Sequence, residues 1–153
     1  IPDICIRTTV IVGFPGETEE DFNELCEYIA QTEFDRLGAF TYSREEDTPA
    51  YDFENQIDEQ TKQDRYDIIM REQLHIAERK NQAFVGKRMT VLCEAYDSVA
   101  EIYYGRSAYD APDIDTKVYF RNALGKKRIA PGAFVEVDIE EAVDYDLIGR
   151  AVV

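Results

Sequence analysis

Cysteine, histidine and positive charge are all scarce in this sequence. Its 153 residues include three cysteines, Cys5, Cys26 and Cys93, and one histidine, His75. The cysteines are far apart and none belongs to a CxxC or CxxxC pair, so the spacing of metal ligands is absent. We expect all three to be small buried side chains in a reducing compartment, which favours a cytoplasmic location. His75 has no cluster of ligand residues around it, and we interpret it as a helix-surface residue.

Long apolar runs are also missing. The longest one, around residues 10–15, is far shorter than the roughly 20 residues that a membrane-spanning helix needs, so we expect no membrane partner. Asp3 and Arg7 interrupt the start of the sequence, so no signal peptide is visible. The first residue is Ile rather than Met and leads straight into a predicted strand. We interpret the sequence as a piece of a longer protein.

Acidic residues outnumber basic ones by a wide margin, and the formal net charge is −15. Residues 1–86 carry −12 of this charge, and the rest of the chain carries −3. Affinity for nucleic acid depends on Lys and Arg contacts to phosphate, so this balance makes nucleic acid an improbable partner. It suits a basic protein, which long-range electrostatic attraction would steer toward the surface. A simpler interpretation is that the acidic surface only maintains solubility.

One stretch, residues 4–21, reads as a buried strand, a glycine turn and a capped helix. Residues 4–12 are rich in β-branched side chains and apolar on both faces, which is typical of a strand covered on both sides. Gly13 and Gly16 permit a sharp turn and close approach to a ligand. Thr18 and Asp21 form a capping-box-like pattern. The acidic first turn, with Glu19, Glu20 and Asp21, excludes a phosphate-binding loop, and an ordinary βα connection remains an alternative to a ligand site.

The rest of the sequence predicts a mixed fold class, α/β followed by all-β. A helix over 18–31 and a strand over 36–42 complete a βαβ unit, and a long helix from residue 59 to about residue 84 ends at Gly86 as its C-cap. Beyond Gly86 the spacing of the apolar residues changes from the helical period of 3.6 to the period of two that is typical of strands. Five strands, over 89–96, 100–104, 117–120, 134–139 and 147–153, predict a small antiparallel OB-like barrel. We therefore expect two domains, residues 1–86 and 87–153.

Two loops carry the remaining candidate binding residues. The polar loop over 43–55 follows the carboxyl end of a parallel strand, where α/β folds place their ligand sites, although it could be a plain surface loop. Four basic residues surround the Gly125 turn, and they could contact phosphate or form a solvated hairpin tip; they are Arg121, Lys126, Lys127 and Arg128. The acidic, turn-rich segment 105–115 suits an Arg/Lys-rich protein better than RNA.

Several of these motifs resemble the C-terminal part of the radical S-adenosylmethionine methylthiotransferase family. The stretch RTTVIVGFPGET at residues 7–18 resembles a late strand and turn of the family's partial TIM-like barrel, and FTYSREEDTPA at residues 40–50 resembles the next strand and loop. The barrel from about residue 87 is similar to the TRAM module that ends these enzymes. The sequence of segment 105–115 resembles the corresponding segment in one branch of the family, which methylthiolates the β-carbon of an aspartate in small-subunit ribosomal protein 12.

The resemblance implies a functional assignment for several residues. Ile11, Gly13 and Tyr42 would belong to the adenosyl pocket, and the TRAM module would dock the basic ribosomal protein. The residues expected to bind that substrate are Arg106, Asp110, Asp113 and Asp115. The alternative is a fragment of a tRNA methylthiotransferase or an RNA-binding TRAM module, which rests on the basic residues around Gly125.

The cofactors of the family are S-adenosylmethionine and two [4Fe–4S] clusters. The CxxxCxxC triplet that ligates the first cluster is absent, as are the cysteines that hold the second, and each cluster needs thiolates at close spacing. We therefore expect this chain to bind no cluster, to contain no catalytic residue and no metal ligand, and to be inactive alone. A chain with only the last third of a barrel should also expose one strand edge and one apolar face, so we expect self-association through residues 4–12.

Overall fold

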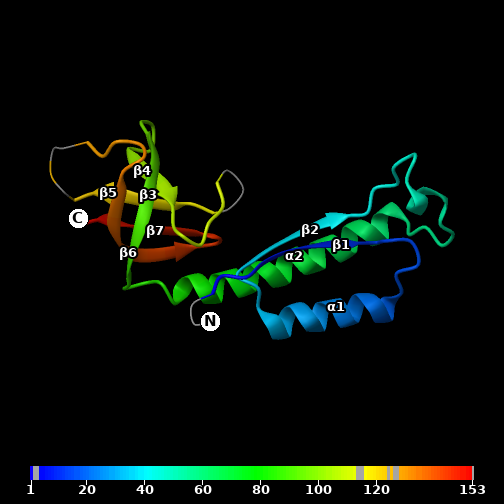
Figure 1. Ribbon diagram of the computed structural model, residues 1–153. Helices are drawn as coiled ribbons and strands as arrows, with labels where there is room; N and C mark the ends of the chain where they lie inside the picture. The colour runs from blue at the N-terminus through cyan, green and yellow to red at the C-terminus, as the bar shows by residue number, and fades with distance from the viewer. Residues whose placement is uncertain (2–3, 113–115, 124, 126–127, 153) are drawn as a thin grey trace. The chain divides into compact units, whose positions relative to one another are not determined.

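A computed structural model describes residues 1, 4–112, 116–123, 125 and 128–152. The chain divides into two compact units, residues 1–76 and residues 77–153, and each is described by itself (Figure 1). The division falls inside the long helix α2 (Glu59–Gln82). The domain boundary that the sequence predicts after residue 86 stays a prediction. Among the described residues, none of the helices combines the length and the apolar composition that crossing a membrane requires.

The first unit is a strand–helix–strand–helix arrangement. Strands β1 (Arg7–Val12) and β2 (Arg36–Thr41) pair in parallel, and α1 (Glu19–Thr32) connects them, as the sequence predicts. A 3₁₀ helix, η1 (Pro49–Asp52), lies in the loop before α2. Strand β1 begins three residues later than predicted because its partner β2 begins only at Arg36, which pairs with Arg7. Ile4 and Ile6 are consequently outside the strand and exposed.

Both helices of this unit begin with the caps that the sequence indicates. The Thr18 hydroxyl accepts a hydrogen bond from the Asp21 amide at 3.1 Å, and the Asp21 carboxylate accepts one from the Thr18 amide at 2.9 Å. Asp58 caps α2 by accepting a bond from the Thr61 amide at 3.0 Å. The pKa of Asp21 is lowered chiefly by its backbone bond to Thr18, and that of Asp58 by the Thr61 hydroxyl and amide. These bonds satisfy orphan donors at each helix start.

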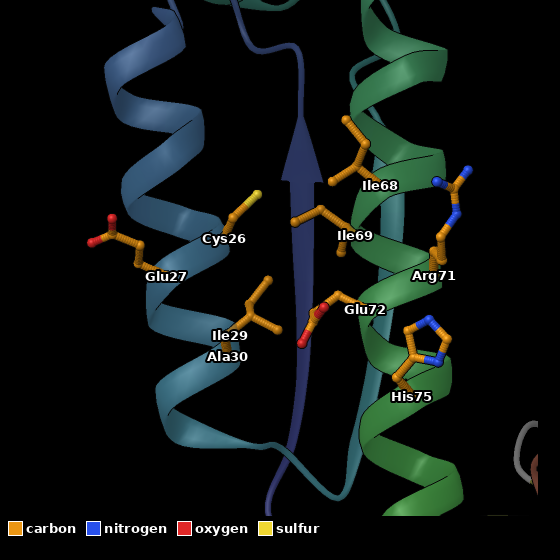
Figure 2. A pocket seen from close by; sticks show the side chains of 9 residues that line it. All are labelled: Cys26, Glu27, Ile29, Ala30, Ile68, Ile69, Arg71, Glu72 and His75. Atoms are coloured by element: carbon orange, nitrogen blue, oxygen red, sulfur yellow. The ribbon is translucent and has the colours of Figure 1, made fainter.

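Among the described residues of the first unit, only one face of the β1–β2 sheet is covered. Val12, Leu37 and Ala39 lie on the covered face and pack with Ile29 of α1 and Ile69 of α2. Both helices lie over that same face (Figure 2). The opposite face carries Ile11 and Phe40, which are 57% and 64% exposed. The expectation of a strand covered on both sides is therefore wrong for this chain, because the sheet has two strands and both helices use one side.

The second unit is a closed barrel of five strands in the order β3-β4-β5-β7-β6. Their bounds are β3 (Arg88–Asp97), β4 (Ile102–Arg106), β5 (Val118–Asn122), β6 (Phe134–Val143) and β7 (Asp146–Ala151). Four neighbouring pairs are antiparallel and β5–β7 is parallel. The predicted antiparallel barrel is thus wrong in one pair. Strand direction cannot alternate throughout a closed ring with an odd number of strands, so a five-stranded barrel needs at least one parallel pair.

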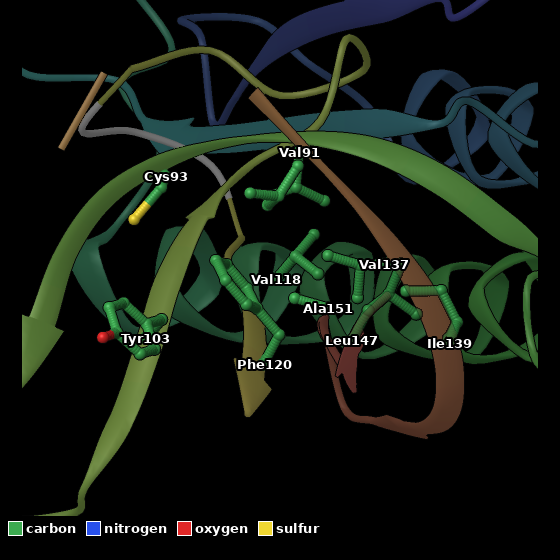
Figure 3. Packing of buried hydrophobic residues seen from close by; sticks show 10 residues of the cluster. Val91, Cys93, Tyr103, Val118, Phe120, Val137, Ile139, Leu147 and Ala151 are labelled. Carbon is green, nitrogen blue, oxygen red and sulfur yellow. The ribbon is translucent and has the colours of Figure 1, made fainter. Parts of the chain in front are cut away.

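The barrel has a hydrophobic core of its own, drawn from every strand (Figure 3). Phe120 is completely buried and stacks on Tyr103 with 5.7 Å between ring centroids. Gly105 allows close strand approach, because a Cβ there would lie 2.1 Å from the carbonyl oxygen of Leu92. Gly86 has φ +82°, yet α2 ends at Gln82, so the predicted C-cap is wrong. The Gly86 amide instead donates to the carbonyl of Ile139 at 2.9 Å.

Candidate functional site

A tight turn follows β1 at the carboxyl edge of the sheet. The amide of Glu17 donates to the carbonyl of Phe14 at 2.9 Å, with Pro15 and Gly16 between them and Gly16 at φ +87°. Proline followed by a positive-φ glycine is the arrangement of a type II turn. The Glu17 carboxylate also accepts a hydrogen bond from the Gly13 amide at 3.0 Å. Glu17 therefore closes the turn with both its backbone and its side chain.

Arg65 of α2 holds this glutamate. Its guanidinium donates to the Glu17 carboxylate at 2.5 Å and to the Glu17 carbonyl at 3.3 Å, and a second nitrogen donates to the Glu19 carboxylate at 2.6 Å. The arginine is 5% exposed. Burial acts to lower the pKa of Arg65, but its hydrogen bonds and charge interactions with Glu19 and Glu17 raise the pKa above its usual value. The guanidinium thus stays charged and joins α2 to the start of α1.

Lys62, one helical turn before Arg65, packs against Gly13. A Cβ built on Gly13 would lie 2.3 Å from Cγ of Lys62, and Gly13 itself has φ +73°. Both observations require glycine at this position. The Lys62 ammonium pairs with the Glu59 carboxylate at 2.6 Å and lies 5.3 Å from the ring centroid of Tyr42. Lys62 therefore contacts both Gly13 and Tyr42.

Tyr42 follows β2 and sits beside this turn. Its amide donates to the carbonyl of Val12 at 2.8 Å, and its ring meets Phe14 edge-on with 5.2 Å between centroids. Among the described residues, the Tyr42 hydroxyl is buried without a hydrogen-bond partner. A buried hydroxyl normally has a partner, and each exception calls for an explanation. An external group at this edge of the sheet would supply one.

The loop between β2 and α2 is attached to the same turn. The Gly16 amide donates to the carbonyl of Asn55 at 3.0 Å, and Phe53 lies 6.1 Å from Phe14, edge to face. Within the loop, Arg44 donates to the carbonyl of Tyr51 at 2.8 Å and lies over the Tyr51 ring at 4.5 Å. The predicted polar loop is therefore ordered against the carboxyl edge of β1 and β2, where parallel sheets bind ligands.

The three predicted adenosyl-pocket residues lie at one edge of the sheet. Gly13 and Tyr42 come together through Lys62. Ile11 pairs across the sheet with Phe40, on the uncovered face just before the turn. The sequence did not lead us to predict a role in the site for Glu17, Lys62 or Arg65. The available signal was that both basic residues fall in line with Ile69 and Ile76, on the buried stripe of α2, where a charged side chain needs a reason.

Two of the predicted substrate-binding residues are engaged within the barrel. Arg106 on β4 forms an ion pair with Glu94 on β3, and both side chains are half-buried. The Asp110 carboxylate accepts hydrogen bonds from the Ser107 amide at 3.1 Å and hydroxyl at 2.6 Å, and from the Thr116 hydroxyl at 3.2 Å. These bonds shape the loop after β4. Asp113 and Asp115 lie outside the described residues.

In the described part of residues 87–153, three of the five arginines form ion pairs with carboxylates. Arg88 pairs with Asp138 at 2.6 Å and Arg150 with Glu140 at 2.9 Å, in addition to the Arg106 pair. Of the four basic residues expected to cluster around Gly125, Arg121 and Arg128 are described and exposed, whereas Lys126 and Lys127 lie outside the described residues. Paired arginines are poorly placed to neutralise phosphates.

A groove of about 450 Å³ lies between α1 and α2, and Cys26 and Ile29 of α1 point toward Ile69 of α2 across it (Figure 2). Burial raises the pKa of the Cys26 thiol, and Glu72 and Glu17 raise it further. Burial and Glu94 likewise raise the pKa of Cys93 in the barrel. Thiolates are the reactive and metal-binding form of cysteine, so neither thiol is prepared for such chemistry.

Known proteins are similar in sequence to both units of the chain. A family model for the TRAM domain matches residues 85–152. Curated relatives named ribosomal protein uS12 methylthiotransferase RimO are 47% identical in Acetivibrio thermocellus and 42% identical in Geobacter sulfurreducens, each over 99% of this chain. A relative of the same name from Clostridioides difficile is 47% identical over 97% of it. The chain belongs to the RimO methylthiotransferase family.

This RimO-family chain spans about a third of the length of those relatives, 33% in each case. The cluster cofactors of the family do not fit its residues. Among the described residues no group of three His, Cys, Asp or Glu side chains could hold a metal, and the three thiols belong to separate segments, before β1, in α1 and in β3. The described residues therefore offer no ligand set for either cluster.

Adenosylmethionine, in contrast, fits the edge described above. Its adenosyl part combines a flat apolar ring with hydrogen-bonding groups. Exposed Ile11 and Phe40 offer an apolar surface on the uncovered face, and Tyr42, which follows β2 at the same carboxyl edge, has a buried hydroxyl without a hydrogen-bond partner among the described residues. Mostly apolar linings with a few placed polar groups are typical of small-molecule sites.

Proposed function

We propose that this chain is part of a ribosomal protein uS12 methylthiotransferase. The full-length enzyme would methylthiolate the β-carbon of an aspartate in uS12 by radical adenosylmethionine chemistry. The observation that carries the proposal is the 47% identity to uS12 methylthiotransferases over 99% of the chain. The parallel β1–β2 pair with its site at the carboxyl edge is consistent with a partial TIM-like barrel in the complete protein.

Within that enzyme, residues of the first unit would bind and orient adenosylmethionine. Ile11 and Phe40 would contact the adenosyl group, Tyr42 would give or accept a hydrogen bond, and Gly13 would let the backbone turn beneath it. Adenosylmethionine and the two [4Fe–4S] clusters together supply the radical chemistry and the transferred sulfur when bound. The clusters would be held by residues outside this chain, which alone would be inactive.

The TRAM domain would dock the ribosomal protein. The net charge of −15 belongs to the chain as a whole, with −12 in residues 1–86 and −3 in the rest, and it favours a basic protein over nucleic acid because a negative surface speeds the approach of a positive partner. Arg106 and Asp110 would contribute by fixing the loop after β4, since their side chains are bonded within the barrel. Asp113 and Asp115, in that same segment of the sequence, stay predicted contacts for basic side chains. The enzyme would act in the cytoplasm.

The deciding experiment uses the full-length protein with its clusters reconstituted. We expect incubation with adenosylmethionine, a reductant and uS12 to add a methylthio group to one aspartate, detected by mass spectrometry of uS12 peptides. A uS12 variant that lacks the target aspartate serves as the control and should remain unmodified. Unmodified wild-type uS12, with adenosylmethionine and both clusters shown to be bound, would contradict the proposal.

The second candidate is an RNA substrate, as in a tRNA methylthiotransferase, and the exposed Arg121 and Arg128 are the observation in its favour. Salt dependence separates the two candidates. Binding that neutralises six to ten phosphates weakens by about 10³–10⁵ between 50 and 200 mM salt. We expect the chain to bind tRNA weakly or not at all at 50 mM salt, and a steep slope with tight binding would favour the RNA candidate.

A further inference from the structure

We propose that Arg65 is a positioning residue for adenosylmethionine. It would hold Glu17, which closes the turn after β1, and this turn would keep Ile11 and Tyr42 in place for the adenosyl group. The inference rests on the proposed function, because it concerns the same site. Arg65 belongs to α2, some fifty residues beyond the turn in the sequence, and among the described residues its hydrogen bonds go to Glu17 and Glu19.

The first step is the way Glu17 shapes the turn. Its amide bonds the carbonyl of Phe14 at 2.9 Å and its carboxylate bonds the amide of Gly13 at 3.0 Å. The Gly13 amide is the first donor after β1. Without the carboxylate, this donor would need another partner, since an unpaired buried amide costs the free energy of a lost hydrogen bond. The conformation of the turn thus depends on where the Glu17 side chain is held.

The second step is the burial of the ion pair. The side chains of Arg65 and Glu17 are 6% and 12% exposed, and Arg65 Cζ lies 5.3 Å from the ring centroid of Phe22 in α1. The two charges are therefore shielded from water and held in one geometry. The second carboxylate on Arg65, that of Glu19, is 76% exposed and, within the described part of the chain, forms no hydrogen bond with the turn. Glu17 and Glu19 consequently provide a buried partner and an exposed partner of the same arginine.

The third step connects the turn with Tyr42, one of the predicted residues of the adenosyl pocket. Phe14 begins the turn, and its ring packs edge-on against Tyr42 at 5.2 Å. Lys62, three residues before Arg65 on the same helix, fills the space beneath Gly13 and reaches the Tyr42 ring. A displaced turn would therefore move Tyr42 and its unpartnered hydroxyl. Arg65 acts on the ligand only through these intermediate residues, which makes it a positioning residue rather than a catalytic one.

The test compares variants of the full-length enzyme that carries its clusters. Arg65→Gln removes the charge that holds Glu17, Glu17→Gln keeps an oxygen acceptor without its charge, and Glu19→Gln is the matched control. The measurements are the dissociation constant for adenosylmethionine by equilibrium dialysis, the iron content, and hydrogen exchange of the amides of Gly13, Phe14, Gly16 and Glu17. We expect Arg65→Gln to weaken binding at least tenfold and to speed exchange in the turn, with iron content unchanged.

The controls fix the interpretation of these results. Glu19→Gln should bind adenosylmethionine within twofold of the wild type, and Arg65→Lys should recover part of the lost affinity because it keeps one charged contact to Glu17. Arg65→Gln with wild-type affinity and only a lower melting temperature would overturn the inference. If Arg65→Gln fails to fold, the double variant Glu17→Gln/Arg65→Gln, which removes both buried charges, takes its place. Wild-type affinity of the double variant for adenosylmethionine would then overturn the inference.

The failure of the inference and the failure of the proposed function look different. If the wild-type enzyme with intact clusters binds no adenosylmethionine, both the proposed function and the inference are wrong. If the wild-type enzyme binds adenosylmethionine and the Arg65→Gln variant binds it equally well, only the inference is wrong.

Discussion

The sheet of β1 and β2 leaves one face uncovered, whereas the five strands of the barrel pair in a closed ring. The two sheets also treat their large apolar side chains differently. Phe40 on β2 is 64% exposed and Phe120 on β5 is completely buried, although both are phenylalanines that lie within paired strands. The barrel therefore buries its apolar face with its own residues. The first unit has an apolar face that needs a ligand, another segment or another chain to cover it.

The most direct way to break this comparison is one substitution made in both units. We expect Phe120→Ala to lower the free energy of unfolding of the barrel by about 3–5 kcal/mol, because it leaves a cavity at the centre of the core. Phe40→Ala should change the stability of the first unit by less than about 0.5 kcal/mol. Hydrogen exchange of amides in each unit, measured in denaturant, reports both values. Equal losses from the two substitutions would contradict the comparison.

Glycine substitutions provide a second comparison between the units. Gly105→Ala on β4 forces a Cβ to within 2.1 Å of the Leu92 carbonyl, so we expect the barrel to lose about 1–3 kcal/mol or more. Gly38→Ala on β2 meets no atom within 4 Å and should be tolerated. Thermal unfolding followed by circular dichroism measures the difference. A Gly105→Ala variant as stable as Gly38→Ala would show that the strands of the barrel can separate freely.

The uncovered face should also govern association. We expect the chain to self-associate through β1 and the face that carries Ile11, and Ile11→Lys should weaken association by about 10- to 150-fold, because burying one Ile contributes about 1.5–3 kcal/mol. Phe134→Lys, at a position 73% exposed in the barrel, is the matched control and should have little effect. Light scattering over a concentration series measures the assembly. A monodisperse monomer at every concentration would contradict this prediction.

The smallest expected effect concerns acid stability of the first unit. The folded pKa of Asp58 lies below the ordinary value of 3.8, so its contribution to stability is present above that value and is lost as the pH falls through the folded pKa. Asn also caps helices well. Asp58→Asn should therefore leave stability at pH 7 nearly unchanged while flattening the loss of helical signal below pH 4. Circular dichroism across pH 2–7 tests this, and an unchanged acid transition would contradict it.

Much of the first unit could be predicted from the sequence because its signals are local. Thr18 and Asp21 are three residues apart, and the capping box they predict is present. The parallel pairing of β1 and β2 follows from the short strand–helix–strand pattern. The strand start could not be predicted, because β1 pairs only where β2 exists, from Arg36 onward. Non-local pairing, rather than β propensity, decided that boundary.

The candidate site was less accessible to sequence reasoning. Gly13 and Tyr42 came from a resemblance, and the structure places both beside Lys62. The contact between Arg65 and Glu17 joins residues 48 positions apart, and charged helix residues are by default assigned to solvent. The barrel shows the same limit. Alternating apolar residues in each strand indicated the inward faces, but the neighbour of β5 depended on how the ring closes.

The parallel pairing of β5 and β7 has a consequence for biosynthesis. Strand β7 lies between β5 and β6, so it supplies hydrogen bonds to both neighbours. It is also the last of the five strands to leave the ribosome. The ring therefore stays open during translation until residues 146–151 have emerged, and the strands made earlier wait as an unfinished sheet with two free edges.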